Sequence, residues 1–375
     1  MTNIVIVGAG LAGAAAAGEL RTLGHEGSIT LIGAEPHPPY ERPPLSKSYL
    51  TGSATVDSTL VHDPQWYADQ AIDLRVGTPV SGLDLAGHRV RTESGDEIAF
   101  DRLLLATGSS PRRLSFADQA GVPTAYLRTI EDSDRIRATL RPGARIAIIG
   151  AGWIGLEVAA AARGAGADVV VFESAELPLL RVLGPQVAQI FADLHRGRGV
   201  DLRLGTNVTT SDLAEADLVV VGVGVIPDTS LALEAGLAVD NGILVDKTLR
   251  TSHPDVWAVG DVANHDHPVL GRRVRVEHWD TAIEQAKVAA HNLLGGQQRY
   301  ERLPYFFTDQ YDLGMEYVGH ATPGPPATEV VIEGDPQACP WRAFWLDEGR
   351  VWAGIHVNDW GAIDEIRERV GRPLT

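Results

Sequence analysis

Two glycine-rich segments of the same form could each hold a dinucleotide. Residues 8–13 read Gly-Ala-Gly-Leu-Ala-Gly, and residues 150–155 read Gly-Ala-Gly-Trp-Ile-Gly. In a G-x-G-x-x-G turn, the first glycine permits the tight turn, the second lets a pyrophosphate approach the backbone, and the third lets helix and strand pack closely. The pyrophosphate then lies at a helix N-terminus, where unpaired N–H groups favour an anion. Two such turns predict two dinucleotides held at once, and hence electron transfer between them.

Each turn is followed by an acidic residue at a suitable spacing. Glu35 lies 22 positions after Gly13, and Glu173 lies 18 positions after Gly155. A carboxylate there accepts hydrogen bonds from a ribose diol. Because Glu173 would repel a 2′-phosphate by several kcal/mol, we expect NADH to be preferred over NADPH by about a hundredfold or more. Alternatively, Arg181 folds back toward the adenosine and softens this preference.

The elements that must position these residues are short apolar strands and alanine-rich helices. One βαβ plan is predicted by strands 3–7, 28–32 and 102–106 with a helix over 14–20. It repeats with strands 145–149, 168–172 and 218–223 and a helix over 154–163. We expect the first plan to resume with strands 243–245 and 256–259 and a helix over 281–294. The proline-rich residues 36–44 predict a rigid loop without regular structure.

The chain changes character after Pro304, where aromatic residues and alternating strands become frequent. Strands at 341–346 and 350–355 and a helix near 363–370 indicate a small α+β region with one antiparallel sheet. The expected fold class is α/β, with two Rossmann-like dinucleotide-binding domains and a small C-terminal α+β domain. The expected domains are 1–108 with 237–303, 109–236, and 304–375.

Composition excludes several function classes. The 375 residues carry a formal net charge of −17, which argues against binding nucleic acid or an acidic membrane. Cys339 is the single cysteine, so an intrachain disulfide and a multi-cysteine metal site are excluded, and we expect no metal. The first strand begins at once, which leaves no room for a signal peptide, and no apolar run reaches the ~18 residues of a membrane span. We expect a cytoplasmic protein.

Further segments give the chain a recognisable pattern. Residues 41–47 read Glu-Arg-Pro-Pro-Leu-Ser-Lys, 105–109 read Leu-Ala-Thr-Gly-Ser, 257–263 read Trp-Ala-Val-Gly-Asp-Val-Ala, and 305–310 read Tyr-Phe-Phe-Thr-Asp-Gln. Together with Gly150 to Glu157, they resemble the NADH-dependent ferredoxin reductases of oxygenase systems, the putidaredoxin- and rubredoxin-reductase-like flavoproteins. The resemblance implies that the first glycine turn binds FAD and the second binds NADH.

The resemblance also implies roles for individual residues. Lys47 would lie beside the flavin ring, paired with Glu157, and these two are the expected catalytic residues. FAD would be held by Gly8, Gly10, Ala12, Gly13, Glu35, Arg42, Lys47, Val80, Ala106, Thr107, Gly108, Arg128, Asp261 and Trp279. NADH would be held by Gly150, Gly152, Trp153, Ile154, Gly155, Glu173, Arg181 and Gly222. Other roles remain open: Arg42 as a surface charge, Asp261 as a plain helix N-cap, and Trp279 and Val80 as core.

The absence of a cysteine after the first βαβ unit bears on the identity of the electron acceptor. Disulfide reductases of this fold need a redox cysteine after the first βαβ unit, and that loop offers Ser46 and Lys47 instead. Since flavin can release electrons one at a time, we expect a two-iron ferredoxin or rubredoxin that serves an oxygenase such as a cytochrome P450. The alternatives are an NADH oxidase or diaphorase, and a redox-sensing interaction protein resembling apoptosis-inducing factor. The basic cluster Arg272, Arg273 and Arg275 is either a docking site for the carrier or a solvated turn.

Overall fold

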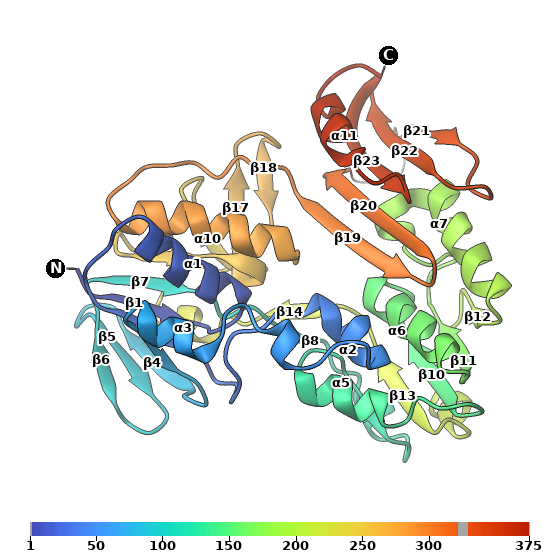
Figure 1. Cartoon of the computed structure of the whole chain (residues 1–375), viewed down its shortest axis with the longest axis horizontal. Coiled ribbons are helices and arrows are strands. Elements are labelled where there is room, and N and C mark those ends of the chain that lie inside the picture. Colours follow the sequence, from blue (N-terminus) through green and yellow to red (C-terminus); the bar gives the residue numbers. More distant parts are fainter. Residues whose placement is uncertain (1, 322–328, 375) are drawn as a thin grey trace. The chain divides into compact units, whose positions relative to one another are not determined.

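The computed structural model describes residues 2–321 and 329–374, which form two compact units (Figure 1). The first unit contains the chain up to Glu41, Asp57–Ser110 and Ile226–Pro304. The second contains Arg42–Val56, Pro111–Val225 and the chain from Tyr305 onward. Each glycine-rich turn therefore belongs to a different unit.

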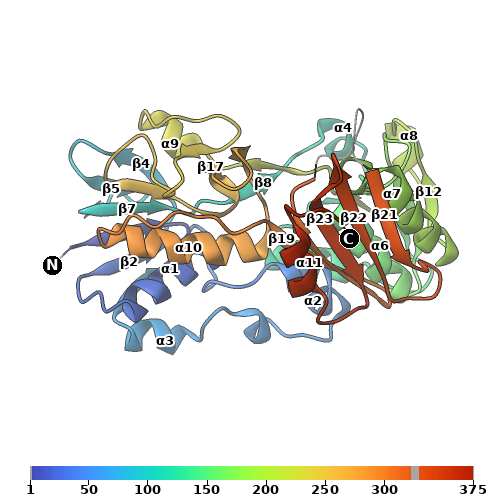
Figure 2. The same cartoon turned by 90° about the horizontal axis from the view of Figure 1, so that it is seen from above.

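A five-stranded parallel sheet forms the centre of the first unit. Its strand order is β16-β7-β1-β2-β3, with bounds Val256–Ala258, Arg102–Leu105, Ile4–Val7, Ile29–Ile32 and Ile72–Arg75. Every residue of β1 and β2 is buried, as expected for parallel strands covered on both faces. Helices α1 (Leu11–Thr22) and α10 (Trp279–Leu293) lie side by side against the sheet (Figures 1 and 2).

Smaller elements complete the first unit. An antiparallel sheet contains β4 (Val80–Asp84), β5 (Arg89–Thr92) and β6 (Glu97–Ala99). Another sheet pairs β15 (Ile243–Val245) in parallel and β18 (Arg272–Val274) in antiparallel with β17 (Ala263–His267). The short helices are η2 (Asp57–Thr59), α3 (Pro64–Asp69), α9 (Ser230–Glu234) and η3 (Gly260–Val262). Strands β8 (Ser109–Pro111) and β14 (Val225–Pro227) span points where the chain passes from one unit to the other.

The second unit repeats the parallel plan. Its sheet has the order β12-β11-β10-β13-β9, with bounds Asp201–Arg203, Asp168–Phe172, Arg145–Ile149, Leu218–Val221 and Thr124–Ala125. The accompanying helices are η1 (Pro43–Ser46), α2 (Ser48–Thr51), α4 (Ser115–Asp118), α5 (Ile130–Arg137), α6 (Trp153–Gly164), α7 (Leu180–Gly197) and α8 (Thr210–Leu213).

The C-terminal residues form an antiparallel sheet within the second unit. Its order is β19-β20-β23-β22-β21, with bounds Tyr305–Gln310, Leu313–Gly319, Arg350–Val357, Trp341–Asp347 and Glu329–Gly334. One continuous apolar core joins this sheet to α6 and α7, since Trp345 and Ile355 pack in the same cluster as Leu156 and Phe191.

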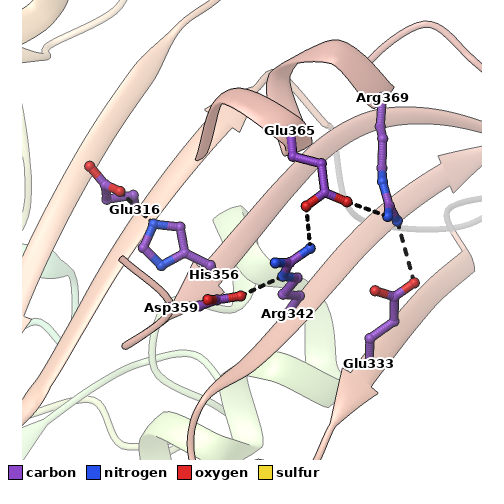
Figure 3. Close-up of polar contacts among 7 residues, drawn as sticks. All are labelled: Glu316, Glu333, Arg342, His356, Asp359, Glu365 and Arg369. Atoms are coloured by element: carbon purple, nitrogen blue, oxygen red, sulfur yellow. Dashed lines mark hydrogen bonds and ion pairs between the residues drawn. The ribbon is translucent and has the colours of Figure 1, made fainter. Parts of the chain in front are cut away.

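A polar network attaches helix α11 (Ile363–Arg369) to this sheet (Figures 2 and 3). Arg342 of β22 contacts Asp359 at 2.6 Å and Glu365 of α11 at 2.9 Å. Arg369 contacts Glu365 at 2.6 Å and Glu333 of β21 at 3.5 Å. The two arginines hold the pKa of the Glu365 carboxyl below its usual range. Helix and sheet are thus joined by charge as well as by the buried Ile366.

The predicted strands and helices are confirmed to within a few residues at their ends. One segment differs, because Pro43 and Pro44 of the expected irregular loop begin the 3-10 helix η1. Proline is tolerated in the first turn of a helix, where its missing N–H would have no helical partner. Over residues 2–321 and 329–374, no helix combines the length and hydropathy required to cross a lipid bilayer.

Candidate dinucleotide and electron-transfer sites

The first glycine turn follows β1 and begins α1. A Cβ built on Gly8 would lie 2.1 Å from the Ala106 carbonyl oxygen, and one on Gly13 would lie 2.0 Å from the Gly8 carbonyl oxygen. Within the described chain, by contrast, a Cβ on Gly10 meets no heavy atom within 4 Å. Internal packing therefore requires two of these glycines. Gly10 faces open space, as a backbone approached by a ligand should.

The second turn, between β10 and α6, has the same construction. A Cβ on Gly150 would lie 2.4 Å from the Gly222 carbonyl oxygen, and one on Gly155 would lie 2.0 Å from the Gly150 carbonyl oxygen. The nearest described atom to a Cβ on Gly152 is the Gly222 oxygen, at 3.9 Å. Gly222 thus lets β13 approach the turn, while Gly152 leaves room beside it.

Both turn helices begin without a side-chain cap. The N-cap residues are Gly10 in α1 and Gly152 in α6, and the described first turns carry no acidic side chain. Helix α5, in contrast, is closed by a capping box from Thr129. An uncapped N-terminus leaves N–H groups free to bind an anion. Open space at the second glycine and uncapped helix N-termini both fit a dinucleotide pyrophosphate in each unit.

The two acidic partners lie at the ends of their predicted strands. Glu173 follows β11, and its Oε2 accepts a hydrogen bond from the Ala151 backbone N–H at 2.8 Å. Its Oε1 accepts one from the Ala175 N–H, also at 2.8 Å. The Ser174 hydroxyl also donates to Oε1 at 3.2 Å. The carboxylate is thus fixed beside the turn, and Oε2 keeps a further acceptor position for a ribose hydroxyl. Glu35, half-buried after β2, accepts a hydrogen bond from the Tyr40 hydroxyl.

The ends of β1, β7 and β16 adjoin in the first unit, which brings three sequence motifs together. Ala12 at the start of α1 faces Gly260, where a Cβ would lie 3.3 Å from the Ala12 Cβ. After β7, Thr107 donates a hydrogen bond to the Asp228 carbonyl at 2.7 Å, and the Asp228 N–H donates to the Gly108 carbonyl at 3.0 Å. Ligands of open α/β sheets bind at this carboxyl edge, where the strand order reverses.

Asp261 is held by Ser109 and Arg275, for which the sequence predicted no such role. Its Oδ2 accepts a hydrogen bond from Ser109 at 2.8 Å, and its carbonyl accepts one from Arg275 at 3.1 Å. Arg275 also pairs with Glu277 at 2.7 Å, and its side chain is only 10% exposed. Arg273 donates to two backbone carbonyls at 2.9 Å. Arg273 and Arg275 therefore support the backbone around Asp261, while Arg272 and Arg273 are the exposed members of the cluster.

The predicted pairing of Lys47 with Glu157 is confirmed within the second unit. Lys47 Nζ lies 2.7 Å from Glu157 Oε2, and the side chains are 16% and 3% exposed. Ser46 donates to the same oxygen, and Thr308 donates to Oε1 at 2.6 Å. Lys47 also lies 5.6 Å from the centre of the Phe307 ring. Both carboxylate oxygens thus accept from at least one donor, and the ammonium keeps some solvent access.

The remaining predicted site residues occupy varied positions. Arg42 donates a hydrogen bond to the Arg128 carbonyl, which places its guanidinium at the Arg128 backbone in the second unit. Ile154 is 42% exposed at the start of α6. Trp153 packs against Phe306, with 4.8 Å between ring centres. Val80 is half-buried at the start of β4, Trp279 is half-buried at the start of α10, and Arg181 is exposed on α7.

Thr308 and Gln310 had a sequence signal that could have identified them. In residues 305–310, Phe306, Thr308 and Gln310 share one face of a strand whose residues at these positions are all buried. Buried polar residues are the informative exception in a core.

Comparison with known proteins identifies relatives over nearly the whole chain. Residues 2–286 match the family model described as pyridine nucleotide-disulphide oxidoreductase, and residues 305–372 match the one described as reductase C-terminal. The ferredoxin–NAD(+) reductase component of the anthranilate 1,2-dioxygenase system of Burkholderia cepacia is 41% identical, covering 94% of this chain and 90% of the relative.

Solved structures agree. The chain resembles putidaredoxin reductase in its covalent complex with putidaredoxin, with a TM-score of 0.92, 38% identity, and coverage of 98% of this chain and 93% of that one. It also resembles the ferredoxin reductase for the CYP199A2 system of Rhodopseudomonas palustris, with a TM-score of 0.93, 35% identity, and coverage of 100% and 96%.

Proposed function

Since this chain belongs to the pyridine nucleotide-disulphide oxidoreductase family, among its ferredoxin–NAD(+) reductases, we propose that it transfers electrons from NADH through FAD to a two-iron ferredoxin. The ferredoxin would serve an oxygenase, as the systems named for its relatives do. One observation carries the proposal: each unit has a glycine turn whose second glycine faces open space at an uncapped helix N-terminus.

FAD would be held at the glycine turn of the first unit. Gly8, Gly10 and Gly13 would receive the pyrophosphate, Glu35 the ribose, and Asp261 the ribityl chain. Arg42 and Arg128 offer guanidinium groups to the phosphates or adenosine. When bound, FAD supplies a ring that accepts two electrons as hydride and can release them singly.

Lys47 and Glu157 would set the electrostatic environment beside the flavin. The ammonium would stabilise negative charge that develops there on reduction, while Glu157 offsets the free-energy penalty of burying the ammonium. Hydride transfer itself requires no general base.

NADH would bind to the second turn through Gly150, Gly152, Gly155 and Glu173. The fixed Glu173 carboxylate supports a preference for NADH, because a 2′-phosphate would be placed against its negative charge. Exposed Ile154 would offer an apolar contact. A cytoplasmic location, where NADH is available, completes this proposal.

The three-domain division is part of the same proposal. It assigns residues 1–108 with 237–303 to FAD and 109–236 to NADH, and 304–375 to a C-terminal domain. The two family matches support a boundary near Pro304, because one ends at residue 286 and the other begins at 305.

The acceptor is tested directly with purified protein loaded with FAD. We expect NADH-dependent reduction of cytochrome c to require an added two-iron ferredoxin, with slow oxygen consumption in its absence. Fast oxygen consumption or direct reduction of small acceptors would instead support an NADH oxidase or diaphorase. A long-lived reduced flavin–NAD complex with little turnover on ferredoxin or rubredoxin would support a redox-sensing interaction protein.

A further inference from the structure

A line of buried side-chain hydrogen bonds ends on the Glu157 carboxylate. Thr308 Oγ1 lies 2.6 Å from Glu157 Oε1, and Gln310 Nε2 lies 3.2 Å from Thr308 Oγ1. Gln310 Oε1 lies 2.8 Å from His195 Nε2, and the Tyr311 hydroxyl lies 3.1 Å from His195 Nδ1. Thr308, Gln310 and His195 are fully buried. The line therefore runs from Tyr311 through the core to the partner of Lys47.

Hydrogen-bond chemistry allows only one direction of donation along this line. An ionised carboxylate can only accept, so the single hydroxyl proton of Thr308 goes to Glu157. Thr308 must then accept from the Gln310 amide nitrogen, which turns the Gln310 oxygen toward His195. His195 must donate from Nε2, and Nδ1 is left to accept from Tyr311. Every donor points toward Glu157, and successive bonds of this kind strengthen one another.

Three elements bring these residues together. Glu157 lies on α6, His195 on α7, and Thr308 and Gln310 on the same face of β19. Their surroundings are apolar, with Phe191 and Phe306 in the same core cluster. Burial lowers the pKa of the His195 ring, while the hydrogen bond with Gln310 raises it, and burial is the larger effect. The ring is therefore neutral near pH 7, as the direction of the line requires.

Packing alone does not call for these residue types. Apolar side chains of similar volume could fill the same space, and replacing a buried polar group together with its partner by apolar groups can leave stability nearly unchanged. What the line supplies is a fixed donor on Oε1 of Glu157, opposite the oxygen shared by Lys47 and Ser46. With both oxygens engaged, the carboxylate cannot rotate away from the ammonium.

We propose that Thr308, Gln310 and His195 are positioning residues, which fix the Glu157 carboxylate and through it the place and charge of Lys47. The inference rests on the proposed function, in which Lys47 lies beside bound FAD. Tyr311 forms the outer end of the line, with the Arg198 guanidinium 5.1 Å from its ring centre.

The test compares Thr308→Val, which removes the hydroxyl donor at nearly constant volume, with Thr308→Ser, which keeps it. In Thr308→Val we expect flavin reduction by NADH to slow by about tenfold, as loss of one charge-assisted hydrogen bond predicts. We also expect the flavin midpoint potential to fall while the KM for NADH stays within about twofold. Thr308→Ser should retain the wild-type rate and potential. An unchanged rate and potential in a folded Thr308→Val protein would overturn the proposal.

A second measurement does not depend on turnover. Nitrogen-15 NMR of the His195 ring should show the Nε2–H tautomer in the wild type. In Gln310→Met the ring should no longer be held in that single tautomer. Gln310→Met also replaces Thr308→Val as the test variant if Thr308→Val does not fold. A wild-type Nδ1–H tautomer would refute the line. If the wild type failed to reduce ferredoxin, the proposed function would fall, whereas the tautomer and the potential would still report on the line.

Discussion

At the scale of single residues, the site is defined by a few fixed charges. Glu173 is anchored by two backbone N–H groups, and Glu157 by three side-chain donors. Such anchoring places negative charge more firmly than a solvated side chain could, because the geometry is fixed before a ligand arrives. Under the proposed function, the consequences would be cofactor choice at Glu173 and control of the Lys47 ammonium at Glu157.

Replacing Glu173 by Gln should weaken the discrimination against NADPH. The amide removes the charge that opposes the 2′-phosphate, so we expect the ratio of kcat/KM for NADH to that for NADPH to fall by about tenfold or more. The matched control is Glu176→Gln, an exposed acidic residue three positions on, which should leave the ratio unchanged. Equal ratios in the Glu173→Gln variant and the wild type would contradict the assigned role.

Replacing Lys47 by Met should slow flavin reduction by NADH by about tenfold or more and lower the flavin potential. The physical reason is the loss of a positive charge beside the place where negative charge develops. Stopped-flow absorbance measures the rate, and Lys287→Met, which removes the exposed pair with Glu284, is the control. Wild-type rate and potential in folded Lys47→Met would remove Lys47 from the catalytic residues.

At the scale of elements, we assign different glycines of each turn to packing and to ligand binding. The backbone of Gly152 is extended, at φ −81° and ψ −174°, so alanine can adopt the same conformation. A Cβ added there would have room among the described atoms. Gly155 instead lies against the Gly150 carbonyl. One turn thus contains a glycine that we assign to ligand approach, Gly152, and another that the contact of helix and strand requires, Gly155.

Alanine at these two positions should therefore have different effects. Gly152→Ala should fold and keep FAD but raise the KM for NADH by about tenfold, since an added methyl group displaces the ligand by overpacking. Gly155→Ala should lower the yield of folded protein and the melting temperature. Circular dichroism and steady-state kinetics distinguish the outcomes, and an unchanged KM in Gly152→Ala would count against pyrophosphate binding there.

At the scale of the whole molecule, buried histidines link stability to pH. Burial lowers the pKa of His265 to about 3, and the neighbouring His267 adds to this effect. Burial also lowers the pKa of His195 and His267. A histidine whose pKa is lowered by folding takes up a proton when the chain unfolds below about pH 6.5, its unfolded pKa. Acid therefore favours the unfolded chain.

The free energy of unfolding should accordingly be unaffected by these groups above about pH 6.5 and fall below it. The slope is about 1.4 kcal/mol per pH unit for each histidine that gains a proton. Urea titrations at pH 7.5 and 5.5 measure it, and His265→Gln should lose less stability than the wild type between these values. His291→Gln, at an exposed position, is the control. Equal losses in the wild type and His265→Gln would exclude this linkage.

The sequence by itself determined the two nucleotide turns, their acidic partners and most strands and helices. These features are local, because a glycine pattern between a buried strand and an alanine-rich helix fixes its own backbone. The motif resemblance also pointed to the pairing of Lys47 with Glu157, although 110 positions separate them.

Only the tertiary structure decided how distant segments meet. Ser109 and Arg275 hold Asp261, and Thr308, Gln310 and His195 converge on Glu157, through contacts between residues far apart in the chain. The C-terminal sheet shares its core with the second glycine turn's helix. No spacing rule encodes such contacts, because they depend on which faces of strands and helices pack together.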